Sequence, residues 1–154
     1  MKYKTFDNDL YNQSDQRGKE AAIKVLSQCL PCVLDPVETA NRYGVDLTIV
    51  DWNNDPYCYV EVEIRNAWKS RKFPFDCLYI PRRKDKFTKL DKRTIFIVFN
   101  NNVTDFVACE GIELNRAVLK ENPNKYVEKG EFFYKIPLTS FHYNSVSELI
   151  TKEE

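Results

Sequence analysis

The sequence of 154 residues has one histidine, four glycines and no long hydrophobic run. A single histidine, His142, leaves little room for chemistry that uses several imidazoles, and we expect a surface or capping role for it. No segment approaches the roughly 20 apolar residues of a membrane-spanning helix, and the N-terminus lacks the apolar stretch of a signal peptide. We therefore expect a soluble, cytoplasmic protein without membrane contact, folded as one domain over residues 1–154 with the first sixteen residues loosely held.

Five cysteines are an odd number in a chain without a secretion signal, so a disulfide framework is not expected. Cys29 and Cys32 form a C-x-x-C pair in "CLPC". This pair follows a predicted helix, whereas redox pairs lie at a helix N-terminus, and a structural zinc site needs four ligands. We expect two small, buried residues at the end of the helix.

The net charge of zero hides a strong asymmetry along the chain. Residues 65–93 hold eleven of the 23 basic residues and three of the 23 acidic ones, a local net charge of +8. Aromatic residues are interleaved with these cations, a mixture suited to phosphates and bases, although a solvated loop and helix would look the same. The candidate phosphate contacts are Lys69, Arg71, Lys72, Arg82, Arg83 and Lys86.

Hydrophobic periodicity predicts an α/β domain with one central mixed sheet. Residues 16–30 form an amphipathic helix, and 45–52 and 57–68 form a hairpin preceded by a short edge strand within 33–44. The run "TIFIVFN" is typical of a buried central strand. Further helices are predicted over 81–90, 112–122 and 145–150, and further strands over 105–111 and 131–138.

The stretch "YVEVEIR" places Glu61 and Glu63 on the same face of a strand, where two carboxylates repel unless water or a cation neutralises them. Asp46 in "YGVDLTIV" begins the partner strand, and Glu20 in "GKEAAIK" lies on the preceding helix. Carboxylates that converge in this way are able to hold Mg²⁺ or Mn²⁺, which prefer hard oxygen ligands.

These motifs resemble the PD-(D/E)XK nuclease superfamily over roughly residues 17–100, in an E-x-E variant, and "VEVE" with the following "FPF" segment is similar to small phage-type proteins. The resemblance implies a restriction-endonuclease-like core in αβββαβ order and a Mg²⁺- or Mn²⁺-dependent deoxyribonuclease acting in the cytoplasm, that of the host if viral. It implies Asp46, Glu61 and Glu63 as metal ligands, with Glu20 as a further acidic catalytic residue. It also permits a homodimer.

Glu63 replaces the lysine of the family motif, which orients the attacking water or stabilises negative charge. Lys69, Lys72 or Lys84 is able to supply that cation from elsewhere in the chain. Each acidic residue also has a structural interpretation: a solvated strand face, a turn for Asp46, and a favourable charge at a helix start for Glu20. The missing lysine favours an alternative, a non-catalytic protein of the same fold that binds nucleic acid or a host protein, for instance a small viral factor.

Overall fold

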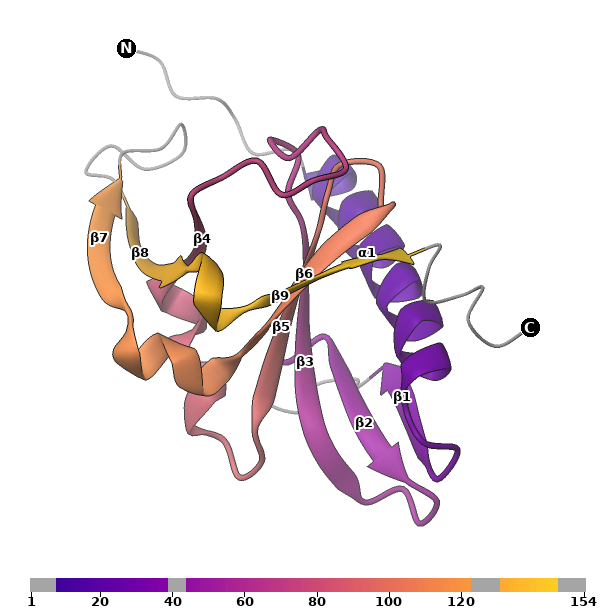
Figure 1. The fold of residues 1–154 in the computed structure, drawn as a ribbon. Helices are drawn as coiled ribbons and strands as arrows, with labels where there is room; N and C mark the ends of the chain where they lie inside the picture. The colour runs from indigo at the N-terminus through magenta and orange to yellow at the C-terminus, as the bar shows by residue number, and fades with distance from the viewer. Residues whose placement is uncertain (1–7, 39–43, 123–130, 147–154) are drawn as a thin grey trace.

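A six-stranded mixed sheet runs through the middle of the protein, with one long helix on one face and a three-stranded sheet on the other (Figure 1). The computed structural model describes residues 8–38, 44–122 and 131–146. The large sheet has the order β1-β2-β3-β5-β6-β9, and the small sheet has the order β4-β8-β7. In the large sheet the strands are β1 (Leu34–Glu38), β2 (Leu47–Asp51), β3 (Pro56–Ile64), β5 (Thr94–Phe99), β6 (Asp105–Glu110) and β9 (His142–Ser145). The remaining elements are α1 (Asn8–Cys29), β4 (Cys77–Pro81), β7 (Val118–Asn122), β8 (Glu131–Pro137) and the 3₁₀ helices η1 (Arg82–Lys89), η2 (Gly111–Arg116) and η3 (Leu138–Ser140).

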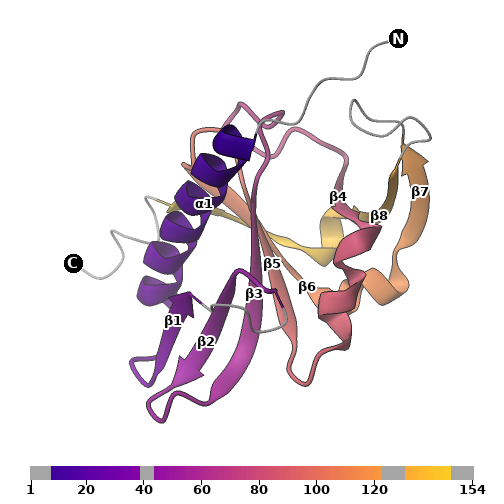
Figure 2. The same cartoon turned by 180° about the vertical axis from the view of Figure 1, so that it is seen from behind.

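Helix α1 packs on the large sheet through an apolar stripe, as its periodicity predicts. Ala22, Val25 and Leu26 are buried against β2, β3 and β5. Gly18 allows a close approach to β3, since a Cβ at this position would lie 3.2 Å from Cγ1 of Val62. Figure 2 shows the helix lying across one side of the large sheet, while the small sheet and η1 lie on the other.

Alternation along β3 divides its side chains between these two layers. Cys58, Val60 and Val62 belong to the core under α1. The odd-numbered positions therefore face η1 and the small sheet, because successive side chains of a strand point to opposite faces. Glu61 and Glu63 share this second face, as the sequence predicts.

Strands β3 and β5 run parallel, with Glu61 opposite Phe96 in the register. A parallel connection must cross over the sheet, and here it passes through β4 and η1 rather than through an α-helix. The helix predicted over 81–90 is a 3₁₀ helix, and the αβββαβ order is not confirmed, because β4 of the small sheet and η1 stand between β3 and β5. The predicted mixed sheet and the predicted edge strand, which is β1, are confirmed.

Several further expectations need correction. Residues 8–16 were expected to be loosely held but belong to α1, while 1–7 lie outside the described residues. The predicted helix over 112–122 is a short 3₁₀ helix followed by β7. The small sheet was not predicted, because β4 pairs with β8 more than fifty residues later in the chain. The predicted helix over 145–150 lies mostly outside the described residues, with Ser145 in β9.

Candidate active site

Two hydrogen bonds tie Asp46 to β3 where β2 begins beside it, one from Val62 and one to Glu61. The ladder between these strands stops at the pair Leu47 and Val60, so β3 continues past the edge of β2. The backbone N–H of Val62 donates to Oδ2 of Asp46 at 2.8 Å. In return the backbone N–H of Asp46 donates to Oε2 of Glu61 at 2.8 Å. The two carboxylates are therefore held side by side by backbone groups.

Glu61 is a charged group buried with incomplete compensation, since its relative exposure is 6%. Burial and, to a smaller extent, the nearby charge of Asp46 raise the pKa of Glu61 to about 7, and the charge of Lys84 opposes both effects. A carboxyl with such a pKa is about half protonated at pH 7, and a further positive charge nearby would favour its ionised form. The negative charge of Asp46 and Glu61 is thus only partly offset, and a cation bound beside them would be stabilised.

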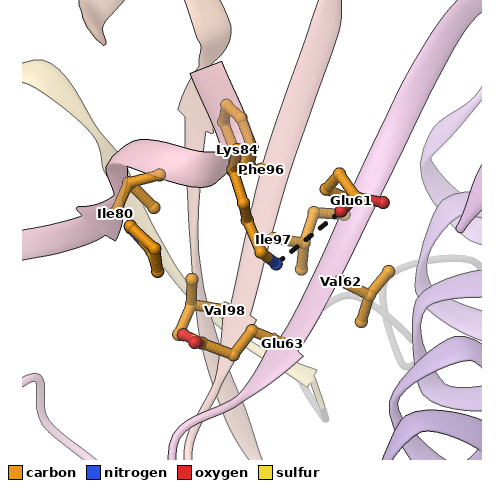
Figure 3. A pocket seen from close by; sticks show the side chains of 9 residues that line it. Glu61, Val62, Glu63, Ile80, Lys84, Phe96, Ile97 and Val98 are labelled. Carbon is orange, nitrogen blue, oxygen red and sulfur yellow. Dashed lines mark ion pairs between the residues drawn. The ribbon is translucent and has the colours of Figure 1, made fainter. Parts of the chain in front are cut away.

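Lys84 supplies part of that positive charge from η1. Its Nζ lies 3.7 Å from Oε1 of Glu61, and its side chain is 17% exposed (Figure 3). Three residues later on η1, Phe87 is buried against Val45 and Tyr59. Positions three apart in a 3₁₀ helix lie above one another, so the packing of Phe87 also directs Lys84 toward β3.

Glu63 lines the same cavity as Glu61 and Lys84, but it has a different partner (Figure 3). Nη2 of Arg65 lies 2.5 Å from Oε2 of Glu63 and also donates to the carbonyl oxygen of Tyr79 at 2.8 Å. Each of the two glutamates therefore has a cation nearby: Lys84 partly offsets the charge of Glu61, and Arg65 pairs with Glu63. Glu63 does not join the carboxylate pair.

Glu20 is exposed and accepts a hydrogen bond from Gln16, one turn earlier on α1. It lies two residues from Ala22, about 200° around the helix from the buried stripe. The residue on the stripe is Lys19, whose Nζ pairs with Asp15 at 3.2 Å and Glu38 at 3.5 Å. The helix phase, extended backward from Ala22, predicts Lys19 and Asp15 rather than Glu20.

The four carboxylates expected in one pocket are thus divided. Asp46 and Glu61 lie together, Glu63 pairs with Arg65, and Glu20 lies on the outer side of α1. Within residues 8–38, 44–122 and 131–146, no three His, Cys, Asp or Glu side chains are grouped so that they could hold a metal ion. What remains is a pair of carboxylates with one lysine.

The predicted phosphate contacts fall into two groups. Lys69, Lys72 and Lys86 are exposed, as are Arg82 and Arg83. The guanidinium of Arg71 is instead committed to the buried carboxylate of Asp105 at 3.0 Å and to Oγ of Ser145 at 2.9 Å. Among the others, Arg83 pairs with Glu131, Arg82 lies over the ring of Phe132 and Lys86 lies over that of Phe87.

Neither the C-x-x-C pair nor the histidine adds to the site. Cys29 and Cys32 are exposed, so the expectation that they are buried is wrong. His142 is an exposed residue of β9, in agreement with the surface role expected. Within the part of the chain that the structure describes, no helix is long and apolar enough to cross a membrane.

Comparison with solved structures finds a similarity to D212, a nuclease from a fusselovirus. The likeness covers 96% of this chain and 92% of the other, with a TM-score of 0.48 and 17% sequence identity. At this identity and this score, it assigns no role to any residue of the site. No protein-family model matches the sequence, and no curated protein matches it either.

Proposed function

We propose that this protein hydrolyses phosphodiester bonds of nucleic acid, with DNA as the expected substrate, and that it depends on Mg²⁺ or Mn²⁺. One observation carries the proposal: the buried Glu61 and the half-buried Asp46 form a carboxylate pair whose charge Lys84 only partly offsets. Residues that only stabilise a fold have no need of such an arrangement, whereas an ion-binding active site does.

The donor set fits a magnesium-like ion. Mg²⁺ binds through one or two carboxylates, keeps several waters and takes further oxygens from a phosphate substrate, so two carboxylates are sufficient. Asp46 and Glu61 would hold the ion, and its arrival would displace the proton that burial favours on Glu61. The ion would polarise a phosphoryl oxygen and lower the pKa of a bound water.

Lys84 takes the role that the family motif gives to a lysine two residues after Glu61. It reaches Glu61 from η1, whereas the motif position is occupied by Glu63. An ammonium group at this point is suited to orienting the attacking water or to stabilising negative charge on the phosphoryl group. The proposal therefore places Lys84 beside Asp46 and Glu61 and leaves Glu63 and Glu20 outside the metal-binding set.

Cleavage assays with matched variants test the proposal. Linear duplex, circular duplex and single-stranded DNA are incubated with Mg²⁺ or Mn²⁺, and the products are separated on gels. We expect cleavage by the wild type and a loss on the order of 10³-fold in Glu61→Gln and Asp46→Asn, since metal-bound charge stabilisation contributes several kcal/mol. Glu121→Gln changes an exposed carboxyl of β7 and should cut as the wild type does. Absence of cutting under every condition would refute hydrolysis.

The second candidate function is binding without catalysis. It is favoured by the two ion pairs, Lys84 with Glu61 and Arg65 with Glu63, which neutralise much of the charge without a metal. A protein of this kind would bind nucleic acid or a host protein with equal affinity in EDTA and in Mn²⁺. It would also tolerate Glu61→Gln, so the same variant separates the two functions.

A further inference from the structure

The 3₁₀ geometry of η1 sorts its side chains into three rows. With three residues per turn, positions i and i+3 lie above one another, and at about 2.0 Å rise per residue successive members of a row are roughly 6 Å apart. One row contains Lys84 and the buried Phe87 and faces the large sheet. A second contains Asp85, which accepts a hydrogen bond from the hydroxyl of Tyr134 on β8. The third row contains Arg83, Lys86 and Lys89.

This third row, which we call the cation row, is basic and exposed throughout. All three side chains are exposed to solvent. The acidic group that pairs with it is Glu131, whose Oε1 lies 3.0 Å from Nε of Arg83. A straight row of cations at this spacing matches neighbouring phosphates along one strand of nucleic acid better than it matches an isolated anion.

An exposed aromatic residue lies beside Arg93, which comes shortly after the row in the chain. Four residues after Lys89, Arg93 precedes β5 and places its guanidinium 5.9 Å from the ring centroid of Tyr57. Tyr57, the second residue of β3, is 51% exposed. Its neighbour on the same face, Tyr59, is fully buried and donates its hydroxyl to Asp91 at 2.7 Å. The exposed ring of Tyr57 therefore lies next to a residue that packing and a hydrogen bond hold in place.

We propose that the cation row and the pair formed by Tyr57 and Arg93 are a binding track for a single strand of nucleic acid. Phosphates lie along Arg83, Lys86 and Lys89, and an unpaired base stacks on Tyr57. Arg83 of the track is adjacent in sequence to Lys84, which contacts Glu61, and as a statement about substrate the track rests on the proposed function. Stacking requires a base free of its partner, which favours a single strand over a duplex.

Binding in EDTA tests the track without requiring cleavage. Fluorescence anisotropy measures the affinity for a labelled 12-nucleotide single strand, as DNA and as RNA, and for the corresponding duplex over a range of salt concentrations. The triple variant Arg83→Gln, Lys86→Gln, Lys89→Gln should reduce the slope of log K against log salt by about 2, because each phosphate contact on a single strand contributes about 0.7. A control triple, Lys24→Gln, Lys120→Gln, Lys135→Gln, removes the same charge from exposed positions elsewhere and should keep the slope.

A second pair of variants tests the aromatic part. Tyr57→Ala should weaken single-strand binding on the order of tenfold, and Tyr57→Phe should retain it, because stacking needs the ring and not the hydroxyl. Tighter binding of duplex than of single strand, or an equal loss in the control triple, would overturn the track. Tyr57→Ala binding as tightly as the wild type would overturn the stacking contact.

The two proposals fail in different ways. Glu61→Gln should bind the single strand in EDTA at least as well as the wild type while cleaving nothing in Mn²⁺. If the wild type never cuts but the cation row still sets the salt slope, hydrolysis is refuted and the track stands. If the wild type cuts and the triple variant binds and cuts equally well, the track is refuted and hydrolysis stands.

Discussion

Glu61 on β3 and Asp105 on β6 are buried carboxylates whose pKa values shift in opposite directions. Both are almost inaccessible to solvent, at 6% and 0% exposure. Burial raises the pKa of Glu61 to about 7. For Asp105 burial acts in the same direction, but hydrogen bonds from Tyr143, Thr104 and Arg71 outweigh it and lower the pKa below its ordinary value.

Asp105 is saturated with donors and serves to hold three segments together. Oδ1 accepts from Nε of Arg71 at 3.0 Å and from the hydroxyl of Thr104 at 2.8 Å, and Oδ2 accepts from the hydroxyl of Tyr143. The amide of Asn100 joins the same network through Thr104 and the carbonyl of Ser70. This network fixes strand β6, strand β9 and the basic segment that follows β3 relative to one another.

The difference between the two sites indicates how to distinguish a structural carboxylate from a functional one. A buried structural carboxylate costs least when both of its oxygens accept hydrogen bonds, as the three donors at Asp105 ensure. Glu61 has one backbone donor, one lysine at 3.7 Å and a like charge beside it. A carboxylate that served only to stabilise the fold would have no need of such a deficit of positive charge.

The largest effect on stability is expected at Asp105, whose carboxylate has three side-chain donors. Asp105→Asn replaces an acceptor oxygen by an amino group and removes the charge that Arg71 contacts, so it should lower the free energy of unfolding by about 3 kcal/mol. Urea denaturation followed by circular dichroism measures the change. Asp35→Asn, at an exposed position of β1, should stay within about 0.5 kcal/mol of the wild type. Equal stability of both variants would remove the contrast.

An effect of similar size and opposite sign is expected at Glu61. Because the folded state raises the pKa of Glu61 from 4.5 to about 7, folded protein binds the proton more tightly than unfolded protein between these values. The free energy of unfolding in EDTA should therefore fall by up to about 3 kcal/mol as pH rises from 4.5 to 7, then level off.

Glu61→Gln has no such group to titrate, so if it equals the wild type near pH 4.5 it should be more stable at pH 8 by about 3 kcal/mol. Thermal melts at a series of pH values in EDTA give this comparison. A wild type whose stability rises between pH 4.5 and 7 relative to Glu61→Gln would contradict the account.

The smallest effect is expected from Lys84. Its charge lowers the pKa of Glu61, so Lys84→Met should move that pKa further upward, measured by ¹³C NMR of the Glu61 carboxyl. The stability change should stay within about 1 kcal/mol, because Glu61, whose pKa is already raised, can take up a proton when the lysine is removed. Lys120→Met on β7 should leave the Glu61 titration where it is. An unchanged or lowered pKa in Lys84→Met would show that the lysine does not act on Glu61.

Much of the framework is readable from local pattern. The stripe of Ala22, Val25 and Leu26 predicts α1, and the apolar runs predict β2, β3 and β5. The step of fifteen residues from Asp46 to Glu61 correctly brings these two carboxylates together across the hairpin. These successes depend on interactions between residues close in sequence.

The failures have long-range causes. Lys84 reaches Glu61 only because η1 is part of the crossover between β3 and β5, and Arg65 turns back to Glu63 because the carbonyl of Tyr79 holds it there. Strand β7 is largely exposed at a sheet edge, so its sequence has no alternation of buried positions that would distinguish it from a helix. The order of the motif points to Glu20 as an acidic site residue, although the phase of α1 places it away from the face that packs on the sheet.

Titration with Mn²⁺ at pH 8, followed by calorimetry and by the melting temperature, tests the central claim most directly. The account predicts stoichiometric binding to the wild type, stabilisation of about 2.7 kcal/mol at one hundred times Kd, loss of both in Glu61→Gln and Asp46→Asn, and retention in Glu63→Gln. The account would be contradicted if the wild type failed to bind Mn²⁺, or if Glu61→Gln bound it as tightly as the wild type does.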